Sequence, residues 1–421
     1  MNITIFGVVY LIILILCFFY KNIKPMIVLL FFSFVLQCDN VLIFNGTGIG
    51  PAIFSCLAFI IRSFINNPSI SKLQHRDFFF LIFVIYIFIN SFLINSNYAF
   101  SIVLKMILLF LYFISYIRLK EIRFYDKAFF EKLINYLFAF LLIIGLVQFF
   151  ISLGVLPKFQ LFQIFLYNDK SNNIGFYTDN YYRLFSTFME PSYMSIVLIF
   201  GFIYFFNKKF NRKNIFFLFF IVLELVLTFS TTAYLGLAIY LLYKFIFEEK
   251  NSKNFTLFIL TCVFIVTLGL TTNVLDTVIF SKASSGSAGT RNIWNSNALE
   301  LFKSNLLFGV GYKQSRASSL IYTLASELGV VGIILYSLFL IPFILDIIKH
   351  RKEKPTFQIA IVISILCCLI ALPDIDLVSF WLIMFFYALN ENLKIVKQSN
   401  KIKSEKFNLY ENPAIKFSYY K

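Results

Sequence analysis

The chain has 421 residues, of which 60% are hydrophobic and 14% are charged, and its mean hydropathy is +0.82. This apolar share exceeds the roughly one half that is usual for soluble domains, so a water-soluble globular protein is excluded. The net charge of +16 does not indicate a nucleic-acid partner, because Lys and Arg occur in short runs between apolar stretches and not on one solvated face. The sequence predicts an integral membrane protein.

Apolar stretches that reach or approach the length of a membrane span follow one another along the chain. A bilayer core about 30 Å thick requires about 20 apolar helical residues. The predicted spans are 3–20, 24–42, 49–66, 78–95, 99–117, 131–153, 191–207, 213–230, 231–247, 254–272, 327–348, 356–372 and 375–392. We therefore predict an all-α, polytopic bundle of about thirteen transmembrane helices. The first is a retained span, because it lacks the basic start and cleavage site of a signal peptide.

The basic residues predict the orientation of the bundle. Alternate loops, counted from the first, hold 28 Lys and Arg, whereas the other loops hold eight. Because cytoplasmic loops are enriched in Lys and Arg, this asymmetry places the N-terminus outside and the C-terminus inside. The two longest loops, 154–190 and 273–326, are then extracytoplasmic.

These boundaries divide the chain into six segments. They are the N-terminal helices 1–153, the first large loop 154–190, the central helices 191–272, the second large loop 273–326 with an amphipathic helix, the C-terminal helices 327–392 and the basic cytoplasmic tail 393–421. Loops this long are usually functional when they are ordered, so the chemistry is expected there.

The first large loop ends with a candidate anion ligand and a candidate base. Arg183 offers paired donors that suit phosphate oxygens, and Tyr182 precedes it in an aromatic stretch that suits either a sugar or a membrane interface. Glu190 stands directly before Pro191, which is typical of a helix start. Glu190 is therefore either a catalytic carboxylate or only a helix-terminal residue.

The second large loop contains an amphipathic segment that begins near Arg291. Trp294, Ala298, Leu301 and Phe302 recur at helical spacing, which predicts a helix on the membrane surface. Gly309-Val310-Gly311 then predicts a turn. Lys313 and Arg316 follow, and exposed surface charge explains each more simply than a ligand role does.

Taken in order, these motifs resemble the O-antigen ligase and Wzy-type polysaccharide polymerase superfamily. The resemblance covers about residues 183 to 340 and places all the motifs on one face of the membrane. The segments that carry it are Arg183, Ser186-Thr187-Phe188, Glu190-Pro191-Ser192, Ser230 to Gly236, Arg291, Trp294, Gly309-Val310-Gly311 and Glu327-Leu328-Gly329 to Gly332.

The resemblance implies an enzyme of the bacterial cytoplasmic membrane that acts on glycans carried by undecaprenyl diphosphate. It implies that Arg183 and Arg291 hold the diphosphate. Glu190, a carboxylate close in sequence to Arg183, is the candidate base for the acceptor hydroxyl or instead orients Arg183. Arg316, Lys313, Trp294 and Tyr182 are further candidate substrate ligands. No cofactor, metal or nucleic acid is expected, while membrane lipid, a chain-length regulator and a flippase are expected partners.

The leading hypothesis is a repeat-unit polymerase, a glycosyltransferase of O-antigen, capsule or another polysaccharide. Ligases of the superfamily typically carry a His-Asn pair where this chain has Ser318 and Ser319, which argues against a ligase that moves finished glycan. A transporter or lipid-linked sugar flippase is the alternative of another class, although no internal repeat supports it.

Two charges inside predicted helices are expected at similar depth below the outer surface. Lys105 and Glu224 each lie six residues from the outer end of their helix, about 9 Å at 1.5 Å per residue. They are predicted either to form an ion pair or to act separately, with Lys105 extending to the surface and Glu224 bonding a neighbouring helix.

Overall fold

The computed structural model describes residues 2–68, 73–94, 100–122, 126–156, 176–178, 181–247, 286–350 and 355–393. This part of the chain is mostly helical. Four helical segments have the length and hydropathy to cross a bilayer, namely α4 (His75–Ile94), α5 (Phe100–Glu121), α6 (Lys127–Ser152) and the continuous stretch Leu320–Lys349. The chain is thus a multi-pass membrane protein. The orientation and the total of thirteen spans stay predictions, and the predicted span 254–272 lies outside the described residues.

The stretch Leu320–Lys349 consists of α14 (Leu320–Thr323), the π turn η2 (Leu324–Leu328) and α15 (Gly329–Lys349). The other helices of the described residues are α1 (Ile5–Phe19), α2 (Lys24–Val35), α3 (Pro51–Asn66), α8 (Pro191–Phe206), α9 (Arg212–Leu227), α10 (Thr231–Phe247), α13 (Gly286–Ser304), α16 (Thr356–Ala371) and 378–393. Two small antiparallel sheets, which the sequence did not predict, join β1 (Asn2–Ile3), β2 (Leu42–Phe44) and β3 (Thr47–Ile49), and β4 (Phe176–Thr178) with β5 (Tyr181–Arg183).

Local sequence explains where several helices begin. Pro51 and Pro191 are the first residues of α3 and α8, a position that needs no backbone N–H donor. The Asp126 side chain accepts a hydrogen bond from the Phe129 N–H at 2.8 Å and so caps α6. The same carboxylate pairs with Lys24 at 2.6 Å, which ties the start of α6 to the start of α2.

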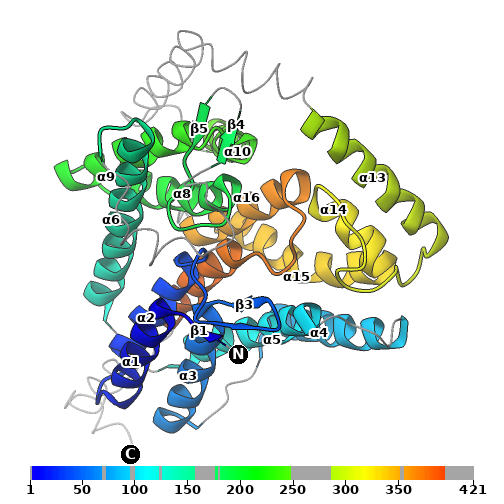
Figure 1. Ribbon diagram of the computed structural model, residues 1–421, viewed down its shortest axis with the longest axis horizontal. Helices are drawn as coiled ribbons and strands as arrows, with labels where there is room; N and C mark the ends of the chain where they lie inside the picture. The colour runs from blue at the N-terminus through cyan, green and yellow to red at the C-terminus, as the bar shows by residue number, and fades with distance from the viewer. Residues whose placement is uncertain are drawn as a thin grey trace, which may run out of the picture.

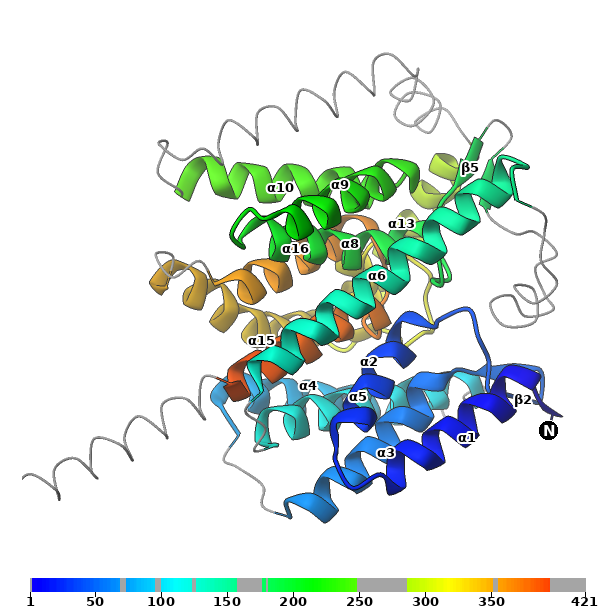
Figure 2. The same ribbon diagram turned by 90° about the vertical axis from the view of Figure 1, so that its left-hand side faces the viewer.

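The helices form two groups that α6 connects. Figure 2 shows α6 crossing diagonally from the group of α1 to α5 towards the group of α8 to α10. Helix α8 packs against α9, α10 and α16, while α4 packs along α15. In Figure 1, α13 stands at the edge of the molecule beside α14, away from the central bundle. Figure 2 also shows the N-terminus, β2 and β5 at the same end of the bundle.

The second helix is shorter than predicted. It ends at Val35 and not at 42, because the backbone N–H groups of Gln37 and Cys38 donate to the Thr187 carbonyl instead of continuing the helix. The chain then enters the β2–β3 hairpin. This early end brings the 36–41 segment against the loop that precedes Glu190.

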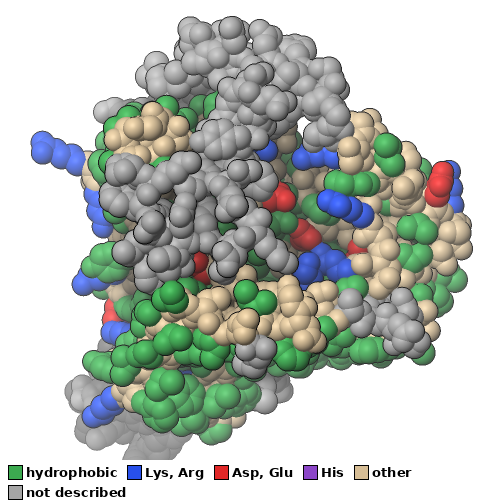
Figure 3. Space-filling view, viewed as in Figure 1, with side chains coloured by type: hydrophobic (Ala, Val, Ile, Leu, Met, Phe, Trp, Pro, Cys, Tyr) green, Lys and Arg blue, Asp and Glu red, His purple; other side chains and the backbone are tan. Residues whose placement is uncertain are grey.

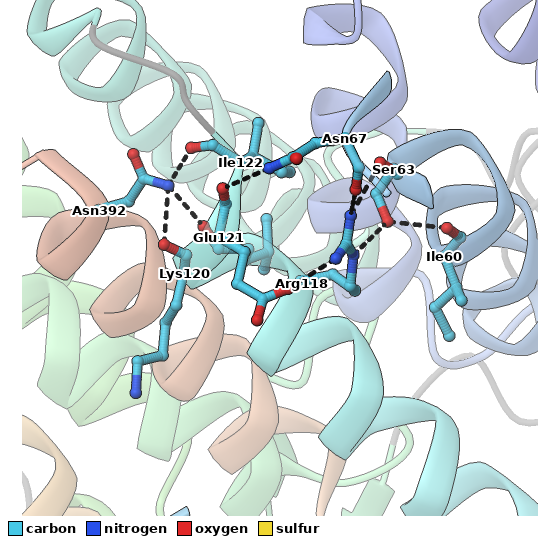
Figure 4. Close-up of polar contacts among 9 residues, drawn as sticks. Ile60, Ser63, Asn67, Arg118, Lys120, Glu121, Ile122 and Asn392 are labelled. Atoms are coloured by element: carbon cyan, nitrogen blue, oxygen red, sulfur yellow. Dashed lines mark hydrogen bonds and ion pairs between the residues drawn. The ribbon is translucent and has the colours of Figure 1, made fainter. Parts of the chain in front are cut away.

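A buried polar cluster joins α3, α5 and the helix 378–393 (Figure 4). The Arg118 guanidinium donates to the Ser63 side chain and carbonyl at 2.9 Å each and to the Asn67 carbonyl, and it pairs with Glu121 at 2.6 Å. Asn392 donates to backbone carbonyls at the end of α5. Arg118 thus adds a second donor to the Ser63 carbonyl, which already accepts from the Asn67 N–H, and bonds the Asn67 carbonyl beyond the end of α3.

Candidate functional site

The loop that leads from Arg183 to Glu190 is threaded into the bundle. Leu184 through Phe188 are all buried, and the Leu184 N–H donates to the Leu227 carbonyl at 3.0 Å. The buried Gln148 amide of α6 accepts from the N–H groups of Phe185 and Ser186 at 3.2 and 2.8 Å. Ser186 has a φ of 50°, so this contact holds a tight, left-handed turn.

Glu190 lies where this loop meets α8. It is the N-terminal flanking residue of the helix, its side chain is exposed, and it accepts a hydrogen bond from the Ser192 hydroxyl at 3.1 Å. The predicted helix start at Pro191 is confirmed. The carboxylate is therefore free to face a ligand while its backbone is fixed by the buried loop.

Helix α13 carries Arg291 and Trp294, and it contacts the loop that contains Arg316 and Ser318. Its Trp294 ring is half-buried, and the Arg316 guanidinium stacks over this ring with 3.8 Å between the guanidinium carbon and the ring centroid. The Asn295 side-chain oxygen accepts from the Ser318 N–H and hydroxyl at 3.0 Å each. These contacts hold Arg316 beside the helix. Because the guanidinium is stacked on the ring, its N–H donors stay free in the plane of the group.

A π turn directs Glu327 towards the site. Gly329 has a φ of 63°, and a Cβ there would meet the Leu307 carbonyl oxygen at 2.4 Å, so only glycine fits. The predicted turn at Gly309 to Gly311 is confirmed, with φ values of 69° and 96°. Glu327 itself is buried, and its Oε2 has no hydrogen-bond partner among the described residues.

Lys313 forms the electrostatic centre of the site. Its Nζ lies 2.6 Å from Asp374 Oδ1 and 2.9 Å from Asp376 Oδ1. Burial lowers the pKa of Lys313, but Asp376, Tyr312 and Asp374 outweigh it and hold that pKa well above its usual value. Burial raises the pKa of Asp376, but Lys313 and Lys105 outweigh burial and hold that pKa below its usual value. Lys313 is thus a permanent cation.

A cavity of about 610 Å³ brings these elements together. Its volume falls in the range of small-molecule sites. The charged residues on its wall are Lys105, Glu190, Arg291, Lys313, Arg316, Glu327 and Asp374, and Tyr193 and Trp294 add aromatic surface. Figure 3 shows basic and acidic side chains gathered in a hollow near the middle of the molecule.

The cations on this wall differ in how far they are neutralised. Lys313 is held by two aspartates, whereas Arg291 and Arg316 are exposed and form no ion pair with any residue that the structure describes. Guanidinium groups without a carboxylate partner are suited to bind an anion with several oxygens, such as a diphosphate. The exposed carboxylate of Glu190 is suited to accept a proton from a hydroxyl, whereas the carboxyl group of Glu327 is buried.

The structure brings most of the sequence-predicted site residues together. Glu190, Arg291, Trp294, Lys313 and Arg316 all line the cavity. The expectation that Lys313 is only an exposed surface charge is wrong, because its side chain is 16% exposed and doubly ion-paired.

Two predicted site residues are placed differently. Arg183 is not among the described residues that line the cavity, and its Nε donates to the Thr228 carbonyl at 3.2 Å. Tyr182 lies in β5, but its side chain lies outside the described part of the chain.

Asp374 and Asp376 were not among the predicted site residues. Both follow Pro373 in the short turn between α16 and the helix 378–393, on the face predicted to carry the two large loops. The signal was present, since two carboxylates in a short turn between two apolar spans require a partner. The partner, Lys313, lies 61 residues away from Asp374 in the chain, so its identity depended on the fold.

The predicted ion pair between Lys105 and Glu224 is wrong. Lys105 lines the cavity, where it contributes to the low pKa of Asp376. Glu224 is buried between α6 and α9, close to Gly145, and neither of its carboxylate oxygens has a hydrogen-bond partner among the described residues. Matching depth in two helices did not imply matching direction.

Comparison with known proteins agrees with the expected resemblance. Residues 215–325 match the family described as O-antigen ligase. No curated protein matches the chain. The match includes α13 and the loop with Lys313 and Arg316, so it covers one side of the cavity. The resemblance to the O-antigen ligase and polymerase superfamily is confirmed for this part of the chain.

Proposed function

We propose that the protein is a polysaccharide repeat-unit polymerase of the bacterial cytoplasmic membrane. It would transfer a growing glycan from undecaprenyl diphosphate onto a lipid-linked repeat unit at the outer face. The observation that carries this proposal is the cavity in which Arg291 and Arg316, without ion-pair partners among the described residues, face the carboxylates Glu190 and Glu327. The family match supports a lipid-linked glycan as substrate.

The proposed reaction forms one glycosidic bond and breaks another. A hydroxyl oxygen of the acceptor sugar attacks the anomeric carbon of the donor glycan, and the bond from that carbon to the diphosphate oxygen breaks. The diphosphate leaves with the bonding electron pair, and the hydroxyl proton passes to Glu190. Arg291 and Arg316 stabilise the charge that develops on the leaving group, which fixed donors achieve well in a site with little water.

Lys313 has a supporting role in this proposal. Because Asp374 and Asp376 already neutralise it, Lys313 contributes position and local field more than a free charge. Arg183 holds the loop before Glu190 in this proposal, through its hydrogen bond to the Thr228 carbonyl. Arg316 replaces Arg183 as the second ligand of the diphosphate, beside Arg291.

A ligase is the second candidate function, because the matching family is described as O-antigen ligase. The two functions differ in what accumulates when the gene is deleted. Loss of a polymerase leaves acceptors capped by one repeat unit, whereas loss of a ligase leaves long glycans attached to undecaprenyl diphosphate. A glycan profile of the deletion strain decides between them.

A reconstituted reaction tests the polymerase directly. The lipid-linked repeat unit that accumulates in the deletion strain is extracted and incubated with the purified full-length protein in proteoliposomes. A ladder of longer glycans, with release of undecaprenyl diphosphate, is the expected result. Absence of both products, with a correctly folded protein, would overturn the proposal.

A further inference from the structure

A second cavity of about 250 Å³ adjoins the first. Lys105, Tyr193 and Asp374 line both cavities, so the two share a wall. The second cavity lies between α2, the β2–β3 hairpin, α5 and the turn before 378–393. Along α5 its lining runs from Ser101 to Tyr112, which is about 16 Å at 1.5 Å per residue.

The charges on this second wall do not suit a diphosphate. Lys105 is the single cation among its described lining residues, and it faces the carboxylates of Asp374 and Asp376. The first cavity, by contrast, has four cations against three carboxylates. An anionic group would therefore prefer the first cavity, and the second is suited to a ligand without charge.

The lining combines apolar and polar side chains. Leu36, Ile53, Leu104, Leu108 and Val378 are among its apolar members. Ser33 and Gln37 already donate to the carbonyls of Leu30 and Phe34 at 2.7 and 3.1 Å. Asn40 and Thr47 are therefore the groups that a hydrocarbon chain would cover without replacing their hydrogen bonds to water, at a cost in free energy.

Asn40 is the clearest polar ligand in this wall. Its side chain has no hydrogen-bond partner among the residues that the structure describes, so both its donors and its acceptor are available. Gly48 faces it across the hairpin, and a Cβ at Gly48 would meet the Asn40 amide at 2.3 Å. The absence of a side chain at 48 leaves room for this amide at the cavity wall.

We infer that the second cavity binds the acceptor sugar. A sugar combines hydroxyl groups with an apolar C–H surface, which matches the mixed lining, and it carries no charge. The shared wall would place its hydroxyl next to the donor's anomeric carbon, as a transfer between two bound substrates requires. This inference rests on the proposed function, since it assigns the second substrate of the same reaction.

Binding of two separate probes tests the inference without relying on turnover. One probe is the free oligosaccharide released by mild acid from the extracted lipid-linked repeat unit. The other probe is undecaprenyl diphosphate. Binding of each to the full-length protein is measured by NMR saturation transfer or by tryptophan fluorescence, and the melting temperature of every variant is recorded.

Asn40→Leu is expected to weaken oligosaccharide binding by about tenfold and to leave undecaprenyl diphosphate binding unchanged. Leu104→Trp, which fills the cavity, is expected to act in the same way and decides the matter if Asn40→Leu does not fold. Asn297→Leu, at an exposed amide of α13 that lines neither cavity, is the matched control. Unchanged oligosaccharide binding in a folded Leu104→Trp variant would overturn the inference.

The failure of the proposed function has a different signature. The double variant Arg291→Ala with Arg316→Ala is expected to lose undecaprenyl diphosphate binding and to retain oligosaccharide binding. If that variant binds undecaprenyl diphosphate as the wild type does, the proposed function fails. If it loses this binding while the Asn40 and Leu104 variants bind both probes normally, only the acceptor site fails.

Discussion

The cluster around Arg118 and the cavity around Arg291 both place guanidinium groups in a membrane bundle, but the two regions differ in how many hydrogen-bond and ion-pair partners these groups have. Arg118 and Glu121 are each 2% exposed, and Arg118 bonds a carboxylate, a hydroxyl and two backbone carbonyls (Figure 4). A similar arrangement surrounds Arg76, which stacks on Phe343 and Tyr387. Arg291 and Arg316 form no ion pair with the described residues.

This contrast separates structural charge from functional charge. A buried charge that is fully bonded holds helices together, and nothing remains for a ligand to bind. A partly exposed charge without a partner contributes little to folding and keeps its donors for a substrate. Substitutions in the two regions should therefore affect different measurements, stability in the first and activity in the second.

The largest expected effect is the loss of stability in Arg118→Ala. This variant removes one side of the buried Arg118–Glu121 ion pair, and breaking a buried pair in this way typically costs about 3–5 kcal/mol. The melting temperature and the yield of folded protein should fall, while the rate per folded molecule is retained. Arg118→Met combined with Glu121→Leu should recover part of the loss, because it removes both charges. An unchanged melting temperature for Arg118→Ala would break the comparison.

The next largest effect is the loss of activity in Arg291→Ala. Removing one donor to a developing negative charge typically slows a reaction about 100- to 1000-fold. Rates of chain extension in proteoliposomes should fall by this factor at an unchanged melting temperature. Lys303→Ala removes an exposed cation from the same helix and serves as the matched control, with a rate close to that of the wild type. Equal rates for the two variants would contradict the proposed role of Arg291.

A smaller effect is expected for Gln148→Leu. This substitution should affect both measurements, because Gln148 is buried and holds the loop that carries Glu190. It removes the acceptor for two buried N–H groups, and each unsatisfied group costs about 1–3 kcal/mol. Hydrogen exchange in the 184–190 loop should become faster, and the rate at saturating substrate should fall several-fold because Glu190 loses its fixed position. Exchange as slow as in the wild type would show that Gln148 does not hold this loop.

The smallest effect concerns the pH dependence of the Lys313 ion pairs. Because the pKa of Asp376 is lowered, its contribution to stability is complete above its ordinary pKa of 3.8 and is lost as the pH falls below that. Because the pKa of Lys313 is raised, its contribution is complete below 10.5 and is lost as the pH rises well above that. In Lys313→Met the burial of Asp376 is no longer offset by Lys313, so the variant loses stability as the pH rises above 3.8. The difference in melting temperature between wild type and Lys313→Met should therefore be smallest in acid and grow as the pH rises above 3.8. A difference that does not change with pH would refute the assignment.

The sequence predicted features that depend on local order along the chain. Hydropathy indicated the long spans, Pro191 marked the start of α8, and Gly309 and Gly311 marked a turn. The amphipathic segment at Trp294 is indeed a helix. Each of these follows from neighbouring residues, so no knowledge of the fold was needed.

Features that depend on contacts between distant residues were not predictable in this way. The second helix ends at Val35 because the chain that follows bonds the Thr187 carbonyl, and Lys313 is not an exposed charge because it pairs with Asp374 and Asp376. Lys105 and Glu224 were expected at matching depth, but Lys105 lines the cavity and Glu224 is buried without a hydrogen-bond partner among the described residues. The direction of a side chain around its helix axis depends on packing, which hydropathy does not report.

The π turn at Leu324–Leu328 has a consequence for how this region tolerates changes in length. It places one more residue in its turn than a regular α-helix does, and one residue corresponds to about 100° of rotation about the axis. Deleting a single residue from the turn would rotate Glu327 by about this angle relative to α15, and its carboxyl would no longer point into the cavity. Frame-preserving deletions here should thus abolish function even when every remaining side chain is unaltered.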